Sequence, residues 1–245
     1  MARASTEPLP TGAAKVVAVR DMFDRIAPRY DLVNRIMTFR LDVRWRRATV
    51  AALRLAPGSL VADLACGTGD LCRDLSRAGL RPVGFDLSYG MLAHARTDAP
   101  LVHADALRLP LATASVAGVT CGFALRNVVD LAGFAAECAR VIRPGGRLAL
   151  LEVSEPTNPV LRRGHGVYFG KVVPWIGARL SDGAAYRYLP RSVAYLPATA
   201  ELLALFASAG FDEMSRETFL GGTAQLLVGT RTGARDASDS VNSAP

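Results

Sequence analysis

Three carboxylates stand at the ends of successive β-favouring segments in the first half of the chain. Asp63 lies in SLVADL, Asp86 in RPVGFDL, and Asp105 with Ala106 in PLVHADA. In doubly wound sheets, ligands bind beyond the carboxyl ends of the strands, and a carboxylate after the second strand accepts hydrogen bonds from ribose hydroxyls. We expect Asp105 to hold an adenine amino group. The spacing therefore predicts a nucleoside site.

A glycine loop, Gly67-Thr68-Gly69, follows the first of these segments. Glycines there let the backbone approach a ligand, although many strand-to-helix turns use glycine only for its positive φ. A dinucleotide site would need G-x-G-x-x-G/A with a pyrophosphate at the helix N-terminus. This chain has Cys72 in the third position and the Asp70 carboxylate where the phosphates would lie. S-adenosylmethionine, which is cationic and carries no phosphate, suits the loop better.

From Ser59 onward, β-rich runs alternate with helical stretches. This order predicts an α/β fold with a doubly wound, mostly parallel sheet of seven strands. Helices are expected from Asp70 to Ala78 and around Asp130 to Ile142. The last two strands flank Gly221-Gly222, which predicts a tight antiparallel C-terminal hairpin at the edge of the sheet.

Two segments lie outside this alternation. Residues 16–54 have helical apolar spacing and are expected to form N-terminal helices before the first strand. Residues 155–196 are rich in Gly, Pro, Tyr, Trp and Arg and are predicted to be an insertion that covers the site. Residues 1–14 and 232–245 are small and polar and are expected to be mobile tails, which leaves 15–231 as a single domain.

The composition is that of a packed protein, with 245 residues of which 50% are hydrophobic. The four cysteines form no CxxC pair, which argues against a zinc site, so no metal is expected and reduced cytosolic thiols fit best. Neither a signal peptide nor a membrane-spanning segment is apparent, so we expect a cytoplasmic protein.

The net charge of +7 is concentrated in two segments. Residues 1–60 hold 11 basic and 5 acidic side chains, and residues 156–191 hold 6 basic and 1 acidic. Such patches attract nucleic acid, anionic lipid or an acidic ligand, and charge alone does not choose among these partners.

The chain resembles the ubiquinone/menaquinone biosynthesis C-methyltransferases, a branch of the class I S-adenosylmethionine-dependent methyltransferases. The resemblance covers about residues 16–231. The glycine loop is common to all class I methyltransferases, whereas the other matching segments are more specific. These segments are FDRIAPRYDLVNRIM (23–37), Trp45-Arg46-Arg47, FALRNVVD (123–130), RVIRPGGRLALLE (140–152) and YRYLPRSV (186–193).

The resemblance implies S-adenosyl-L-methionine as the cofactor and the methylation of a ring carbon of a prenylated demethylquinol. The cofactor residues that it implies, together with those of the loop, are Asp63, Gly67, Thr68, Gly69, Asp86, Asp105, Ala106 and Gly122. Relatives often have Ser where this chain has Gly122. They also have Gly and His at the positions of Arg40 and Asp42, and Glu at that of Arg191.

The Asp42 variant and the preference for arginine resemble actinobacterial members, which favours demethylmenaquinol as the substrate. The alternatives are a benzoquinol of the ubiquinone pathway and another small molecule methylated by an enzyme of the same fold. A nucleic-acid methylator is disfavoured, because FALRN differs from the D/N-P-P-Y/F/W pattern of such enzymes, and no nucleic-acid partner is expected. A homodimer is compatible with the sequence.

The methylation that the resemblance implies requires a proton to leave the ring hydroxyl, because this makes the neighbouring carbon nucleophilic. Arg126 and Asn127, at the end of the fourth predicted strand, are expected to stabilise the quinol anion and to order a water that takes the proton. Tyr30 either hydrogen-bonds the ring oxygen or is an ordinary half-buried tyrosine. Asp130 either takes part or caps the following helix.

The insertion and the N-terminal helices are expected to wall a closed pocket for the ring and its tail. The aromatic side chains expected to line it, or else to pack in a core, are Tyr168, Phe169, Trp175, Tyr186 and Tyr188. Because a prenylated quinone lies in the bilayer, the arginine-rich segments are expected to bring the protein to the inner face of the cell membrane as a peripheral protein. A solvated arginine surface is the alternative.

Overall fold

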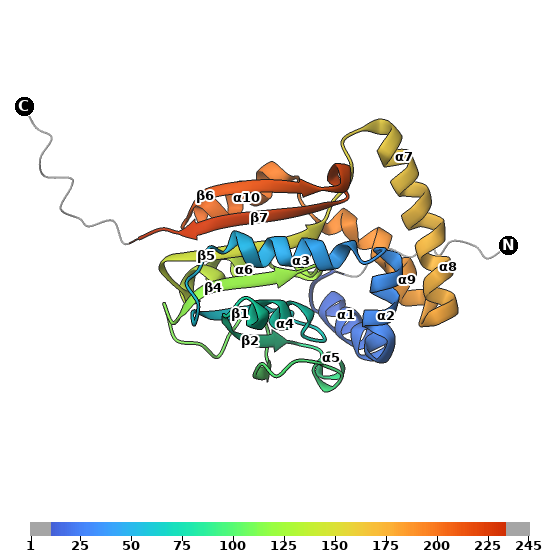
Figure 1. The fold of residues 1–245 in the computed structure, drawn as a ribbon. Coiled ribbons are helices and arrows are strands. Elements are labelled where there is room, and N and C mark those ends of the chain that lie inside the picture. The colour runs from blue at the N-terminus through green and yellow to red at the C-terminus, as the bar shows by residue number, and fades with distance from the viewer. Residues whose placement is uncertain (1–10, 234–245) are drawn as a thin grey trace, which may run out of the picture.

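The computed structural model describes residues 11–233 and contains one seven-stranded sheet (Figure 1). The strands are β1 (Leu60–Leu64), β2 (Arg81–Asp86), β3 (Leu101–His103), β4 (Val116–Gly122), β5 (Ile142–Val153), β6 (Phe211–Phe219) and β7 (Ala224–Arg231). The α-helices are α1 (Gly12–Ile26), α2 (Tyr30–Met37), α3 (Leu41–Ala52), α4 (Asp70–Arg77), α5 (Tyr89–Ala93), α6 (Leu131–Val141), α7 (Pro159–Val167), α8 (Val173–Leu180), α9 (Gly183–Ser192) and α10 (Thr199–Ser208).

The strand order β3-β2-β1-β4-β5-β7-β6 confirms the predicted doubly wound α/β fold. Strands β1 to β5 are parallel to one another, and β7 runs antiparallel to both β5 and β6, which confirms the C-terminal hairpin. The hairpin lies at the edge of the sheet as predicted, with β6 as the outermost strand. Its connection was predicted wrongly, because a 3₁₀ turn over Leu220–Gly222 replaces the tight two-residue turn.

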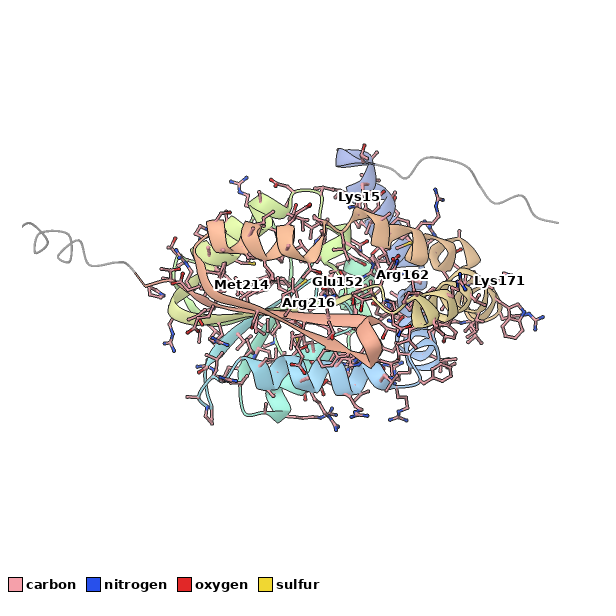
Figure 2. The ribbon with its side chains drawn as sticks, turned by 90° about the horizontal axis from the view of Figure 1, so that it is seen from above. Lys15, Glu152, Arg162, Lys171, Met214 and Arg216 are labelled. Atoms are coloured by element: carbon pink, nitrogen blue, oxygen red, sulfur yellow. The ribbon has the colours of Figure 1, made fainter. Side chains whose placement is uncertain are left out.

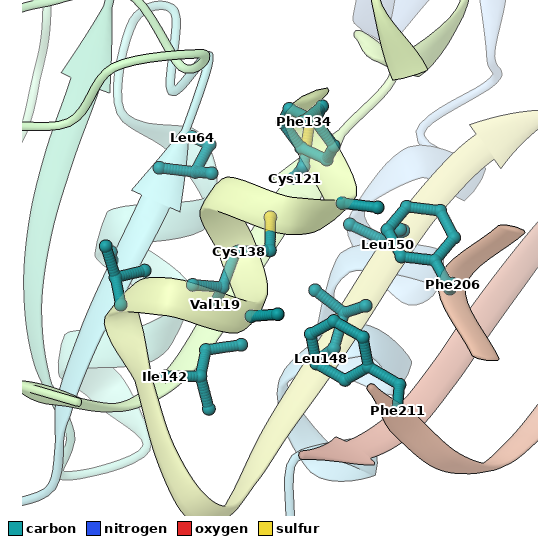
Figure 3. Close-up of a cluster of buried hydrophobic side chains, with 14 of the residues drawn as sticks. Leu64, Val119, Cys121, Phe134, Cys138, Ile142, Leu148, Leu150, Phe206 and Phe211 are labelled. Atoms are coloured by element: carbon teal, nitrogen blue, oxygen red, sulfur yellow. The ribbon is translucent and has the colours of Figure 1, made fainter. Parts of the chain in front are cut away.

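Helices cover both faces of the sheet, and each face has its own apolar core. On one face, α6 and α10 contribute Phe134, Cys138 and Phe206, which pack with strand residues (Figure 3). On the other face, Leu53 next to α3 and Leu75 of α4 pack against β1, β5 and β7. Sheets with helices on both faces expose the carboxyl ends of their strands for ligand binding.

Helix α6 begins where Asp130 accepts a hydrogen bond from Gly133 N, so this carboxylate caps the helix. The capping alternative for Asp130 is thereby the one that the structure shows. Ser88 caps α5 in the same way, by accepting from Met91 N.

A third apolar cluster lies beyond the sheet, between the N-terminal helices and the insertion. It joins Met22, Ile26 and Val33 to Val173 and Tyr186. Helices α1 and α2 and the insertion lie at the same end of the molecule, whereas α3 lies over the sheet (Figure 1). The predicted N-terminal helices are confirmed, and the insertion over residues 155–196 consists mainly of α7, α8 and α9.

The predicted tail 1–14 is wrong in its last residues, because α1 already begins at Gly12. Residues 1–10 and 234–245 of the predicted tails lie outside the described residues. None of the helices described over residues 11–233 has a stretch long and apolar enough to cross a membrane.

The packing of α8 on α9 depends on Gly177. A Cβ at this position would lie 2.2 Å from Cγ of Tyr186, a ring with 0% exposure. We expect Gly177→Ala to destabilise the protein by about 1–3 kcal/mol, since the buried ring must move. Gly170→Ala is the matched control, because nothing lies within 4 Å of its added Cβ. Denaturant unfolding measures both variants, and an unchanged midpoint for Gly177→Ala would contradict the described packing.

Candidate active site

Two cavities meet where β1 and β4 end. The larger cavity has a volume of about 470 Å³ and the smaller about 150 Å³. Their walls share several residues from the N-terminal helices and the strand ends, so a ligand in one cavity lies next to a ligand in the other. The shared residues are Phe23, Tyr30, Ala65, Gly67, Gly122 and Phe123.

The smaller cavity contains most of the predicted nucleoside residues. Asp86, Asp105 and Ala106 line it together with the shared Gly67 and Gly122. Asp86 Oδ2 accepts from Gly67 N at 2.7 Å, which ties the end of β2 to the glycine loop. Burial raises the pKa of this carboxyl. Asp105 is exposed and accepts from the backbone of its own loop.

The backbone around the cavities is held in the left-handed region at several positions. Gly67 and Gly69 have φ of 56° and 79°, as expected for the loop that opens α4. Gly69 lies in neither cavity wall, and a Cβ there would meet Thr97, so its role is the turn. Ala65 and Phe123 adopt φ of 50° and 59° although neither is glycine. Such strained backbone concentrates at binding sites, and both residues line both cavities.

Asp63 lies in the wall of the larger cavity and is 1% exposed. Its two oxygens accept from Thr120 Oγ1 at 2.8 Å and Cys72 Sγ at 3.3 Å. Burial raises the pKa of this carboxyl to about 7. Among residues 11–233 Asp63 has no salt-bridge partner, so the group is suited to a ligand that brings its own positive charge.

Two carboxylates that were not predicted from the sequence, Asp24 and Asp31, attach the N-terminal helices to the loops after β2 and β1. Asp24 Oδ1 accepts from Ser88 Oγ at 2.5 Å and from Gly90 N at 2.8 Å, next to the end of β2. Asp31 accepts from the buried hydroxyl of Thr68 in the glycine loop. Asp24 lies on α1 and Asp31 on α2, and both belong to the matching segment 23–37, which was the available signal.

Arg126 and Asn127 lie together in a short 3₁₀ turn, η2 (Leu125–Asn127), after β4. Arg126 is 5% exposed and lines the larger cavity. Its Nη1 donates to Glu152, whose other oxygen accepts from Arg126 N at 3.0 Å. Asn127 lines the smaller cavity and accepts from Tyr188 OH at 3.1 Å. Glu152 was not singled out from the sequence. The available signal was that it is the one acidic residue of the strand Ile142–Val153.

Arg126 is also held by the insertion, through a hydrogen bond from Nε to Ser192 Oγ at 3.1 Å. No hydrogen-bond partner for its Nη2 exists in the described part of the chain. The guanidinium is therefore anchored on one side and available to a ligand on the other.

Tyr30 lies where the two cavities meet and is half-buried. Its ring packs edge-on against Phe23 with centroids 6.0 Å apart. Burial raises the pKa of its phenol. The hydroxyl therefore keeps its proton at neutral pH and can donate a hydrogen bond.

The predicted substrate-binding aromatics separate into two groups. Tyr168 and Phe169 line the larger cavity, and Tyr168 OH donates to Met37 O at 2.6 Å. The structure places Trp175 and Tyr186 outside the cavity wall: Trp175 is 59% exposed and Tyr186 is fully buried in the cluster between the helices. Tyr188 reaches Asn127 and not the wall. An aromatic-rich covering segment needs some of its rings to pack its own helices, and composition does not distinguish these rings from lining ones.

Two departures from the family pattern have local structural effects. Arg40 precedes α3 with φ of 62°, a conformation that favours glycine. Asp42 is buried, accepts from Thr38 Oγ1 at 2.6 Å and pairs with Arg46.

Gly122 is a third position at which the chain differs from the sequences it resembles. It has only Leu71 near its Cβ position, at 3.8 Å, so the chain leaves room for a larger residue there.

No group of three or more His, Cys, Asp or Glu side chains placed to bind a metal ion occurs over residues 11–233. The four cysteines are free and buried.

The buried Asp63 predicts a pH dependence of stability in the ligand-free protein. Because its pKa is raised from 3.8 to about 7, the folded state binds this proton more tightly than the unfolded chain does. The resulting stabilisation is complete below about pH 4 and is lost as the pH rises through 7. Asp63→Asn removes this loss. The free energy of unfolding of the variant minus that of the wild type should therefore grow between pH 4 and 7, by at most about 1.4 kcal/mol per pH unit.

Urea unfolding across this pH range measures the difference. Asp105→Asn, which removes an exposed carboxylate of the same site, is the control. Parallel curves for Asp63→Asn and the wild type would show that the carboxyl is ionised throughout and would contradict the argument.

The fold and the site can be compared with known proteins. A family model described as the ubiE/COQ5 methyltransferase family matches residues 11–231. A protein of Syntrophotalea carbinolica named ubiquinone/menaquinone biosynthesis C-methyltransferase UbiE is 42% identical over 222 residues, which cover 87% of this chain and 94% of that protein. A demethylmenaquinone methyltransferase of Thermus thermophilus is 42% identical over 221 residues, which cover 86% of this chain and all 100% of that protein.

Solved methyltransferase structures share the fold. A SAM-dependent methyltransferase of Thermotoga maritima has a TM-score of 0.59 at 19% identity, covering 86% of this chain and 99% of that one. An S-adenosylmethionine-dependent methyltransferase of Mesorhizobium loti has a TM-score of 0.55 at 21% identity, covering 75% and 96%. The structural likeness shows the fold, and the family model with the curated relatives shows the family. The chain belongs to the ubiE/COQ5 methyltransferase family.

Proposed function

We propose that this protein methylates a ring carbon of a reduced, prenylated demethylquinol with S-adenosyl-L-methionine, and that demethylmenaquinol is the substrate. The observation that carries the proposal is the common wall between an acidic cavity of nucleoside type and a larger cavity lined by Arg126. The names of the relatives, which refer to demethylmenaquinone and to ubiquinone/menaquinone biosynthesis, support it. A benzoquinol of the ubiquinone pathway is the second candidate.

The residues of the site fit S-adenosylmethionine. Asp86 and Asp105 would hold the ribose and the adenine in the smaller cavity, as carboxylates at these strand ends do in nucleoside sites. Asp63 and Thr68 line the larger cavity and would hold the cationic amino acid end there, so the cofactor would extend from the smaller cavity into the larger one. When bound, the cofactor supplies a methyl group on a sulfonium. The unpaired, buried Asp63 carboxyl is the structural observation that favours a cationic ligand over a dinucleotide.

The acceptor side of the site is built to stabilise an anion. A phenolic hydroxyl has a pKa near 10, so the site must favour the deprotonated quinol. The guanidinium of Arg126 carries a fixed positive charge, and its Nη2 would contact the quinol anion. Glu152 and Ser192 hold the guanidinium in place. Tyr30, which lines both cavities, would donate to the same ring oxygen. Asn127, which lines the smaller cavity next to Arg126, would order the water that takes the proton. Arg126 is not the base, because a guanidinium stays protonated.

The larger cavity matches a prenylated ring in size and character. Its inner part is walled by Trp45, Tyr168 and Phe169. Its outer wall consists of exposed apolar side chains from three separate segments, which we call the rim: Phe39, Val160, Leu161 and Leu220, between 50% and 77% exposed. A prenyl tail that leaves the cavity would pass over this rim.

The rim also suggests how the protein meets a lipid-bound substrate. The basic residues Arg162 and Arg163 follow Val160 and Leu161 in α7. Lys171 comes later in the insertion, and Figure 2 labels it together with Arg162. Apolar side chains flanked by cations are the pattern of a surface that binds anionic headgroups. We propose peripheral contact with the inner face of the cell membrane through the rim.

Methyl transfer is tested with the purified protein, S-adenosylmethionine and either reduced demethylmenaquinone or a reduced demethylbenzoquinone. We expect a product with one added ring methyl from the naphthoquinol. Arg126→Met is expected to lower kcat by about 10²–10³-fold while the cofactor still binds, because it removes a preorganised contact to developing charge. Arg126→Lys should restore only part of the rate, since lysine keeps the charge without the fork.

Mass spectrometry of the product and calorimetry of cofactor binding give the two readouts. Methylation of an oxygen in place of carbon, or full activity of Arg126→Met, would contradict the proposed mechanism. Turnover of the benzoquinol alone would contradict the choice of substrate.

Membrane contact is tested by co-sedimentation with vesicles at low salt. We expect the wild type to sediment with vesicles that contain phosphatidylglycerol and not with neutral vesicles of phosphatidylcholine. Val160→Glu, at the rim, should weaken binding about tenfold, because it loses apolar burial and adds repulsion. Val17→Glu on α1, an exposed apolar residue outside the rim, is the control. Equal binding of the two variants, or no binding of the wild type, would contradict a contact through the rim.

A further inference from the structure

Lys15 is a buried cation that the proposed mechanism does not use. It lies in the first turns of α1 and is only 4% exposed. Of the 29 Lys and Arg residues of the chain, only two are lysines. The other lysine, Lys171, is exposed on the insertion (Figure 2). Burying an ammonium group is costly unless its donors are paired, so the contacts of Lys15 need an explanation.

The ammonium group binds the backbone on both sides of Asn127. Nζ donates to Arg126 O at 2.9 Å and to Val128 O at 3.3 Å. It also lies 3.6 Å from the centroid of the Tyr195 ring. Carbonyl groups at the end of a helical turn carry partial negative charge, and an aromatic face attracts a cation. The ammonium group of Lys15 thus caps the C-terminal end of η2.

The placement is unfavourable in one respect. Burial and the nearby Arg126 guanidinium both lower the pKa of Lys15. Glu152 compensates the guanidinium from the side of β5, whereas Lys15 has no carboxylate partner among the described residues. A neutral or shorter side chain would avoid this repulsion. In return, the cation donates hydrogen bonds to two backbone carbonyls at the end of the turn that carries Arg126 and Asn127.

The same helix covers the smaller cavity. Val16, Val19 and Phe23 of α1 line that cavity, and Asp24 binds the helix to the loop after β2. Helix α1 therefore has two attachments, one at Asp24 beside the nucleoside cavity and one at Lys15 beside the acceptor-side turn. A helix that lines the smaller cavity is in this way connected to the turn that carries Arg126, which lines the larger cavity, and Asn127, which lines the smaller one.

We propose that Lys15 is a positioning residue that sets the orientation of Arg126 and Asn127 from α1, the helix that lines the smaller cavity. The proposal rests on the function proposed for these two residues.

Three variants separate this role from a general effect on α1. Lys15→Met keeps the length and apolar stem, Lys15→Arg keeps a cation, and Asp24→Asn loosens the other attachment of the same helix. We expect Lys15→Met to lower kcat about 10- to 100-fold at saturating donor, with the Kd for S-adenosylmethionine within about threefold of the wild type. Lys15→Arg should recover most of the rate. Asp24→Asn should raise the Kd for the donor more than it lowers kcat.

Calorimetry and methylation kinetics give these values, and retained donor binding shows that the variants are folded. If Lys15→Met weakens donor binding as Asp24→Asn does and keeps its kcat, Lys15 only holds the helix down and the proposal is overturned. An unchanged kcat and Kd in Lys15→Met overturns it as well.

A second readout does not depend on quinol turnover. Acetylation of the protein, followed by mass spectrometry of its peptides, compares Lys15 with the exposed Lys171 as an internal reference. We expect Lys15 to be modified at least about tenfold more slowly than Lys171. Equal rates of modification for the two lysines would show that Lys15 does not hold the turn and would overturn the proposal. A wild type that shows this protection but methylates no demethylquinol overturns the proposed function instead.

Discussion

Two carboxylates, Asp24 and Asp31, accept hydrogen bonds from the loops that follow β2 and β1, and these bonds hold the N-terminal helices on the sheet. The enclosure of the site depends on these contacts, because α1 and α2 supply walls to both cavities. A cavity that excludes water strengthens every electrostatic interaction within it. The folded sheet provides the loops, but the helices that precede it in the chain turn these loops into an enclosed site.

The site places groups of opposite charge close to the common wall. Asp63 and Arg126 are both buried and line the larger cavity, and the half-buried Asp86 lines the smaller one. Buried charges are costly, and the structure offsets the cost at Arg126 with Glu152. Asp63 lacks such a partner among the described residues, which is why it favours a cationic ligand. The same arrangement draws the electrophile and the anion to adjacent positions, as the transfer of a methyl cation equivalent requires.

The sequence predicted the features that depend on local pattern. The alternation of strands and helices predicted the doubly wound, mostly parallel sheet. Asp86, Asp105 and Gly122 line one cavity because strand ends of a parallel sheet meet at one edge. Contacts between distant segments escaped this reasoning. Lys15 meets a turn 111 residues away, and Glu152 meets Arg126 from the next strand. The aromatic insertion shows the same limit, since Tyr186 packs between helices and Trp175 faces solvent.

The central claim is that a methyl group passes from the acidic cavity to a quinol ring in the larger one. Mass spectrometry of the quinones in cells that lack this protein tests it most directly. The account predicts that a prenylated quinone without one ring methyl accumulates, and that the wild-type chain, but not its Arg126→Met variant, restores the methylated form. A normal quinone profile in the deleted cells, or equal rescue by both chains, would contradict it.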